Sequence, residues 1–151
     1  MWYTDAMPSD QDHHVVWERR QAELWDRVFQ VTQDVMALAQ TLEGGGAVAV
    51  VREELTRSAV AVGMELVRAN AADVRTDFVR HVRMARLRAI ETDYLLRLVY
   101  VLQQQEDIQR DLSSVITQYA AIVDLLRKFG RHTGKEADVI VRHTHGPRVI
   151  D

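Results

Sequence analysis

The chain is free of proline across almost its whole length. Its two prolines are Pro8 and Pro147, and proline breaks a helix more strongly than any other residue, at a cost of about 3 kcal/mol in a helix interior. Glycine forms a cluster at 44–46, where a helix hairpin is expected, and only Gly63 lies inside a periodic stretch. The distribution predicts an all-α chain.

Apolar residues recur at alternating spacings of three and four in four segments, which places them on one face of a helix each. The expected helices cover about 14–42, 47–70, 73–102 and 107–130, and either Asp73 or Thr76 is expected to cap the third. Because the connections are short, neighbours run antiparallel. We predict an up-down-up-down antiparallel four-helix bundle. Its expected seam residues include Leu24, Val28, Val31, Val35, Leu38 and Leu42, then Leu55, Ala59, Val62 and Leu66, then Ile108, Leu112, Val115, Tyr119, Ile122, Leu126 and Phe129.

The two ends of the chain lack this period. We expect residues 1–12 to form a flexible N-terminal tail, residues 13–130 the bundle, and residues 131–151 a flexible C-terminal tail. The segment 138–142 is either disordered or a short strand that pairs with a partner. The longest apolar run, at 47–51, is far shorter than the roughly 20 residues of a spanning helix, so a cytoplasmic protein without a membrane partner is predicted.

The third expected helix carries two groups of apolar residues. The first group, for the core, is Phe78, Val82, Ala85, Ala89, Leu96, Val99 and Tyr100, and the second is Met84, Leu87, Tyr94, Leu95 and Leu98. The second group would face water in a single bundle, which favours self-association through it. The alternative is a helix wedged between two neighbours, which is apolar over a wide arc without any oligomer.

Residues that would carry chemistry are scarce. A di-metal bundle needs Glu-x-x-His pairs, and none occurs in the sequence. His81 is the one histidine in the interior of an expected helix and lies about a turn from Asp77. It is interpreted either as a hydrogen-bonded structural residue or as a ligand. His143 and His145 are too few for a closed metal site. The chain has no cysteine, and the glycine cluster lacks the Gly-Lys-Ser/Thr ending of a phosphate loop. We predict no catalytic residue, metal, cofactor or small-molecule substrate; a di-metal enzyme is the remaining enzymatic alternative.

Basic residues gather locally although the formal net charge is -3. Residues 1–51 hold three arginines against eight acids, whereas residues 52–102 hold nine against seven. On the third expected helix, Arg75, Arg86 and Arg97 recur every eleven residues, a spacing that returns to nearly the same angle on a helix. The spacing predicts a basic stripe, and guanidinium groups suit contact with phosphate. The alternative is a solvated face neutralised by Asp93 and by acids of the first helix. The candidate nucleic-acid-binding residues are Arg75, Arg83, Arg86, Arg97, Arg127, Lys128 and Arg131.

The residues of three helices carry a family resemblance. They are residues 78–85 and 89–96, Leu24, Phe29 and Thr32, and the small-residue stretch 57–62. In them the chain resembles the bacterial four-helix bundle proteins first noticed as products of intervening sequences in large-subunit ribosomal RNA genes. It departs where that family commonly has Pro and Asn, since Gly63, Met64 and Glu65 stand there, and Asp93 replaces the usual Glu.

The resemblance implies an up-down bundle that forms a ring-shaped homo-oligomer, a pentamer, and it transfers no catalytic residue. A related branch comprises the accessory variability proteins of diversity-generating retroelements, whose ring-shaped pentamers bind a reverse transcriptase and its RNA through basic surfaces. Those proteins are typically basic overall, unlike this chain. Two hypotheses follow: a non-enzymatic scaffold or adaptor that binds a protein or RNA partner, and a nucleic-acid-binding accessory subunit of a reverse transcriptase.

Overall fold

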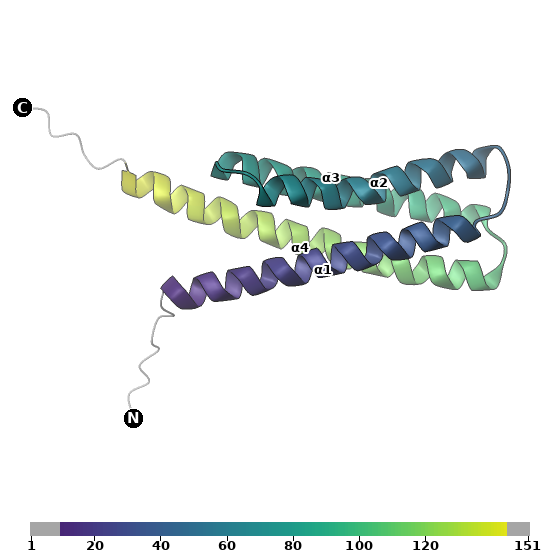
Figure 1. Cartoon of the computed structure of the whole chain (residues 1–151), viewed down its shortest axis with the longest axis horizontal. Coiled ribbons are helices and arrows are strands. Elements are labelled where there is room, and N and C mark those ends of the chain that lie inside the picture. The colour runs from purple at the N-terminus through teal and green to yellow at the C-terminus, as the bar shows by residue number, and fades with distance from the viewer. Residues whose placement is uncertain (1–9, 145–151) are drawn as a thin grey trace, which may run out of the picture.

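The computed structural model describes the backbone of residues 10–144 and the side chains of residues 19–130. No strand occurs between residues 10 and 144. Four long helices account for nearly all of this part of the chain (Figure 1), namely α1 (Asp10–Thr41), α2 (Ala47–Asn70), α3 (Arg75–Leu102) and α4 (Glu106–Thr144).

Each helix packs against two others. α1 contacts α2 and α4, and α3 contacts the same two helices, so α1 and α3 stand at opposite corners of the bundle. Consecutive helices run in opposite directions, and α1 and α4 extend past the α2–α3 turn at the end where both termini emerge (Figure 1). The predicted all-α four-helix bundle is confirmed.

The core follows the predicted seams. The wholly buried side chains include Leu55 of α2, Leu96 of α3, and Leu112 and Tyr119 of α4. Burial of such side chains contributes about 1.5–3 kcal/mol each relative to exposure. The apolar period therefore fixed the inward face of each helix.

The core face of α3 differs from the prediction at two positions. Tyr100 was predicted to be a core residue, but it is exposed, because it lies at the margin of that face beside α4. Thr92 takes part in the core instead, although it is polar. Its hydroxyl donates to the Arg88 carbonyl at 2.7 Å and lies 2.8 Å from the Ser58 hydroxyl of α2. Those bonds satisfy a group that would otherwise be costly to bury.

The glycine cluster forms the α1–α2 turn as predicted. Gly44 and Gly46 have φ of 128° and 58°, in the region that favours glycine because it lacks a Cβ. Arg52 donates to the Leu42 carbonyl at 2.5 Å and so satisfies one of the free carbonyls at the end of α1.

The start of α3 corrects the predicted cap. The N-cap is Val74 rather than Asp73 or Thr76, and no side chain bonds the free N–H groups there. The extended backbone of Val74 allows its carbonyl to accept from the N–H groups of Asp77 and Phe78, both at 3.1 Å. The backbone begins the helix without help from a side chain, and the acidic Asp77 in the first turn suits the helix dipole.

The first and last helices, α1 and α4, are longer than predicted. α1 begins at Asp10, within the predicted N-terminal tail, and α4 continues to Thr144 instead of ending near Arg131. The segment 138–142, for which a strand or disorder was expected, is helical. Gly134 costs only about 1 kcal/mol in a helix, and no proline occurs before Pro147. Loss of the apolar period therefore does not mark the end of either helix; residues 1–9 and 145–151 lie outside the described part.

Candidate functional site

The side of α3 that points away from the bundle is apolar. Tyr94 is 62% exposed and Val101 78% exposed, and four further large apolar side chains are exposed on the same arc of the helix. We define the outer α3 face as Leu87, Ile90, Tyr94, Leu98, Val101 and Leu102. Side chains of this kind along one helix form a patch of the size that marks interaction surfaces.

The predicted second group of α3 is only partly exposed. Leu87, Tyr94 and Leu98 are exposed, as expected. Met84 and Leu95 are half-buried, and Leu95 packs against the core. The correction follows from geometry, because Met84 and Leu95 lie on the flank of α3 that turns toward α2. Ile90, Val101 and Leu102 belong to the exposed arc and were missing from the prediction.

The position of α3 in the bundle can be compared with the alternative that α3 is apolar over a wide arc because it is wedged between two neighbouring helices. α3 has two neighbours, α2 and α4, which cover its inner and lateral sides. The exposed side chains of the outer α3 face point away from both. The chain itself therefore leaves these side chains uncovered within its described residues.

A second apolar surface, which the sequence analysis missed, lies along α1 and α2. Phe29 is 64% exposed, and Trp25 and Met36 follow the same side of α1 at spacings of four and seven. We define the α1/α2 face as Trp25, Phe29, Met36, Val60, Met64 and Val67. The signal was present in the sequence as a weaker apolar line beside the main seam of α1.

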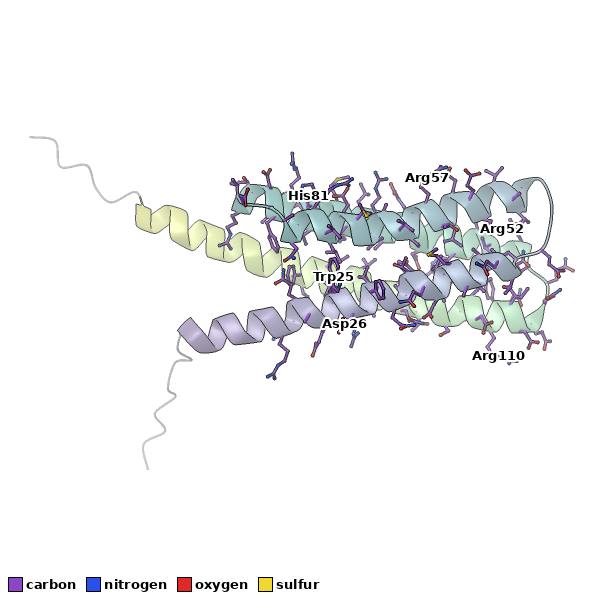
Figure 2. The ribbon with its side chains drawn as sticks, in the orientation of Figure 1. Trp25, Asp26, Arg52, Arg57, His81 and Arg110 are labelled. Carbon is purple, nitrogen blue, oxygen red and sulfur yellow. The ribbon has the colours of Figure 1, made fainter. Side chains whose placement is uncertain are left out.

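Contacts between α1 and α2 set the register of this surface. The Gln21 amide donates to the Asn70 side chain at 3.5 Å, and Met36 lines a shallow groove together with Thr56. In this antiparallel register Phe29 is level with Gly63. Figure 2 shows Trp25 on α1 beside the α2–α3 hairpin, where it lines a cavity with Ala69 and Asn70.

Gly63 forms a notch in the α1/α2 face. A Cβ atom built at Gly63 would meet no atom within 4 Å. The packing of the single chain therefore does not need a glycine there, although glycine in a helix interior is less favourable than alanine by about 1 kcal/mol.

The arginines of the predicted basic stripe on α3 differ in whether they form ion pairs. Arg97 pairs with Asp93 at 2.9 Å and also lines a groove between α3 and α4. Arg83 and Arg86 form no ion pair within the residues whose side chains are described, whereas Arg75 does have an interaction partner. Of the alternative, neutralisation by Asp93 is confirmed at Arg97, whereas neutralisation by acids of α1 is wrong, because α1 stands at the opposite corner from α3.

Two further candidate cations lie on α4 and share one carboxylate. Lys128 Nζ is 2.8 Å from Asp124 Oδ2, and Arg127 pairs with the other oxygen of the same group. The hydrogen bond from Lys128, with the charges of both cations, lowers the pKa of Asp124. Arg127 and Lys128 are thus partly neutralised, and the side chain of Arg131 lies outside the described part.

His81 has a different partner from the one expected. Its Nδ1 lies 2.8 Å from Glu65 Oε2 across the α2–α3 contact, whereas Asp77 pairs with Arg80. Arg68 donates to the other oxygen of Glu65 at 2.7 Å. Burial raises the pKa of the Glu65 carboxyl, but the bonds and charges of His81 and Arg68 outweigh it and hold this pKa below its ordinary value. The geometry fits the structural interpretation of His81.

An apolar cavity lies where α1 and α4 begin to extend beyond the other helices. It measures about 330 Å³ and is lined by apolar side chains with two amides at its rim, Gln21 and Asn70. None of its lining residues is titratable, so the lining itself offers no group for acid–base chemistry. In the part of the chain with described side chains, no three metal-binding side chains gather. Over that same part, no helix has the length and apolar content needed to cross a bilayer.

Comparison with known proteins shows a likeness of fold. No family model and no curated protein matches the chain. Among solved structures, the chain is similar to a protein of unknown function from the S23 ribosomal protein family of Bacteroides thetaiotaomicron VPI-5482, with a TM-score of 0.65 and 20% identity. The match covers 74% of this chain and 98% of the other. The two proteins therefore share a fold.

Proposed function

We propose that this protein is a non-enzymatic helical-bundle scaffold or adaptor that assembles into a ring-shaped homo-oligomer and presents its remaining surface to a protein or RNA partner. The observation that carries the proposal is the exposed outer α3 face. The family resemblance of the sequence favours a pentamer. The bundle supplies the rigid frame, since its four helices enclose one continuous core.

The energy of the outer α3 face supports assembly. With about 200 Å² for a fully exposed large side chain, its six residues expose about 600 Å² of surface. Burial of that area contributes on the order of 15 kcal/mol, which is comparable to the upper end of the cost of association, about 4–15 kcal/mol. Assembly through this face is therefore favourable when the partner surface is apolar as well.

The proposal is tested by the mass in solution. At micromolar concentration, light scattering should give a mass several times the 17.3 kDa of one chain. The outer α3 variant, Tyr94→Asp with Leu98→Asp, should be monomeric, because it places charges in the contact. A matched control, Ser114→Asp with Ala121→Asp at exposed positions of α4, should keep the mass of the wild type. A monomeric wild-type protein would refute the scaffold.

A second candidate function is that of a nucleic-acid-binding accessory subunit of a reverse transcriptase. The observation that favours it is the absence of ion pairs at Arg83 and Arg86 among the described side chains. Repetition of these guanidinium groups around an oligomer would concentrate positive charge despite the net charge of -3. Guanidinium groups bind phosphate through paired N–H donors.

Salt dependence separates the two functions. An accessory subunit should retain a structured RNA at low salt and lose affinity steeply as salt rises. Substitution of Arg83, Arg86 and Arg97 by Gln should abolish retention, while Arg57→Gln at an exposed position of α2 should reduce it little. Absence of RNA retention at low salt by the wild-type oligomer would leave the scaffold alone.

A further inference from the structure

The two apolar faces of the bundle match in extent. The six side chains of the α1/α2 face are 40–64% exposed, and the six of the outer α3 face are 37–78% exposed. The α1/α2 face thus amounts to about 550 Å² and the outer α3 face to about 600 Å² of mostly apolar surface. A specific interface buries about 1,200–2,000 Å² in total, of which somewhat more than half is apolar. The two faces together supply the apolar part of one such interface.

The faces also differ in shape. The α1/α2 face has its notch at Gly63, near its middle, where a Cβ would meet nothing. The outer α3 face has Tyr94 near its middle, and that ring is 62% exposed. A small residue lets a side chain of a neighbour approach the helix backbone closely. A projecting ring and an open notch are complementary.

We infer that the contact between copies is heterologous: the α1/α2 face of one copy receives the outer α3 face of the next, with Tyr94 seated over Gly63 of its neighbour. This inference rests on the proposed assembly and names the surface that receives the outer α3 face. The occupant is a second copy of this chain, because one kind of contact then covers both apolar faces of every copy. A contact of the outer α3 face with itself would leave about 550 Å² of the α1/α2 face in water, near the upper end of the about 300–600 Å² of the largest apolar patch on a typical monomer.

A mixing experiment tests the inference with the full chain. The α1/α2 variant, Phe29→Asp with Val60→Asp, and the outer α3 variant each lose one face at exposed positions. Alone, each should be monomeric. When they are mixed in equal amounts, the intact outer α3 face of the first should bind the intact α1/α2 face of the second. Native mass spectrometry should then show a dimer with one copy of each variant. The altered faces carry the same charge and do not attract each other.

The outcomes separate this inference from the proposed function. A wild-type monomer would refute assembly itself. A wild-type oligomer that persists in the α1/α2 variant, or a mixture that stays monomeric, would overturn the heterologous contact while assembly stands. The α4 control variant should behave as wild type in both measurements.

Gly63→Ala gives an independent readout. In the monomeric outer α3 variant it should raise Tm by about 2–4 °C, since alanine favours the helix and meets no neighbour. In the wild-type background the same change should weaken association at least tenfold, because the added methyl group fills the notch. Unchanged association together with the raised Tm would overturn the seat at Gly63.

Discussion

The two helices at opposite corners of the bundle, α1 and α3, solve the same packing problem with different residues. α1 fills its inner side with Leu and Val, among them Leu24, Val31 and Val35. The buried positions of α3 include Ala85, Ala89 and Thr92, which are smaller or polar. Small residues allow closer approach, and α3 packs more extensively against its neighbours than α1 does. Among the described side chains, the helix with the smaller core residues also bears the largest exposed apolar surface.

This difference separates two meanings of an apolar residue on a helix. On the inner side of either corner helix, apolar character reports packing within the chain. On the outer side of α3 it does not, since α2 and α4 leave Tyr94 and Val101 in water. The comparison can be tested by changes on each side and at each corner, with unfolding measured in the outer α3 variant so that association does not contribute.

The largest effect is expected inside α3. Leu96→Ala should lower the free energy of unfolding by about 2–5 kcal/mol, because Leu96 is wholly buried and its removal leaves a cavity. Leu98→Ser in place of the Asp of that background should leave the same free energy nearly unchanged, since Leu98 is exposed. Urea denaturation measures both. Equal losses would break the division between inner and outer sides.

A smaller effect is expected from the polar core residue of α3. Thr92→Val should lower the free energy of unfolding by about 1–2 kcal/mol, because its hydroxyl bonds to α2 and to the backbone in a dry site. Thr41→Val on α1 is the matched control, since its hydroxyl donates to the Leu38 carbonyl at 2.7 Å from an exposed residue. We expect it to cost less. A larger loss at Thr41 would reverse the contrast between the two corners.

The α2–α3 contact should also respond to acid. The folded-state pKa of Glu65 is below the value of 4.5 that applies to the unfolded chain. The unfolded chain therefore takes up the proton first, so the stability that Glu65 contributes is present above pH 4.5 and is lost as pH falls through the lowered pKa. Glu65→Gln should flatten this dependence in chemical denaturation series between pH 5 and about pH 3. A variant with the unchanged slope would show that Glu65 is not the group responsible.

The smallest effect is expected at the exposed ion pair of α3. Arg97→Gln should change the free energy of unfolding by less than about 1 kcal/mol, because pairs in water contribute little. Thermal unfolding at low and high salt measures it. A large loss would mean that the arginines of α3 stabilise the fold instead of serving a ligand.

Prediction from the sequence was best where one physical rule acted alone. The inward positions from Leu24 to Leu42 and from Ile108 to Phe129 follow the helical period, and all of these seam residues are buried. It was weakest where two rules competed. The burial of Thr92 was not predicted because the residue is polar, and its partner Ser58 lies on another helix. Tyr100 was predicted to be buried because its ring is largely apolar, but it lies at the edge of the core face and is exposed. The end of α4 was misplaced because packing and helix continuation were treated as one signal.

The candidate surfaces were predictable only in part for a related reason. The outer position of Leu87, Tyr94 and Leu98 could be read from the helical angle. The α1/α2 face could not, because it combines residues from two helices whose register is set by contacts such as Gln21 with Asn70. The pairing of His81 with Glu65 likewise joins residues that are distant in sequence.

By itself, the order of residues determined that the chain is helical, where the α1–α2 turn lies and which side of each helix turns inward, because those properties depend on near neighbours along the chain. The tertiary structure decided which helices pack against each other, which apolar residues of α3 are half-buried and which are exposed, and that Gly63 opens onto a second apolar face. These depend on the register and closeness of packed helices, and helical periodicity carries no information about either.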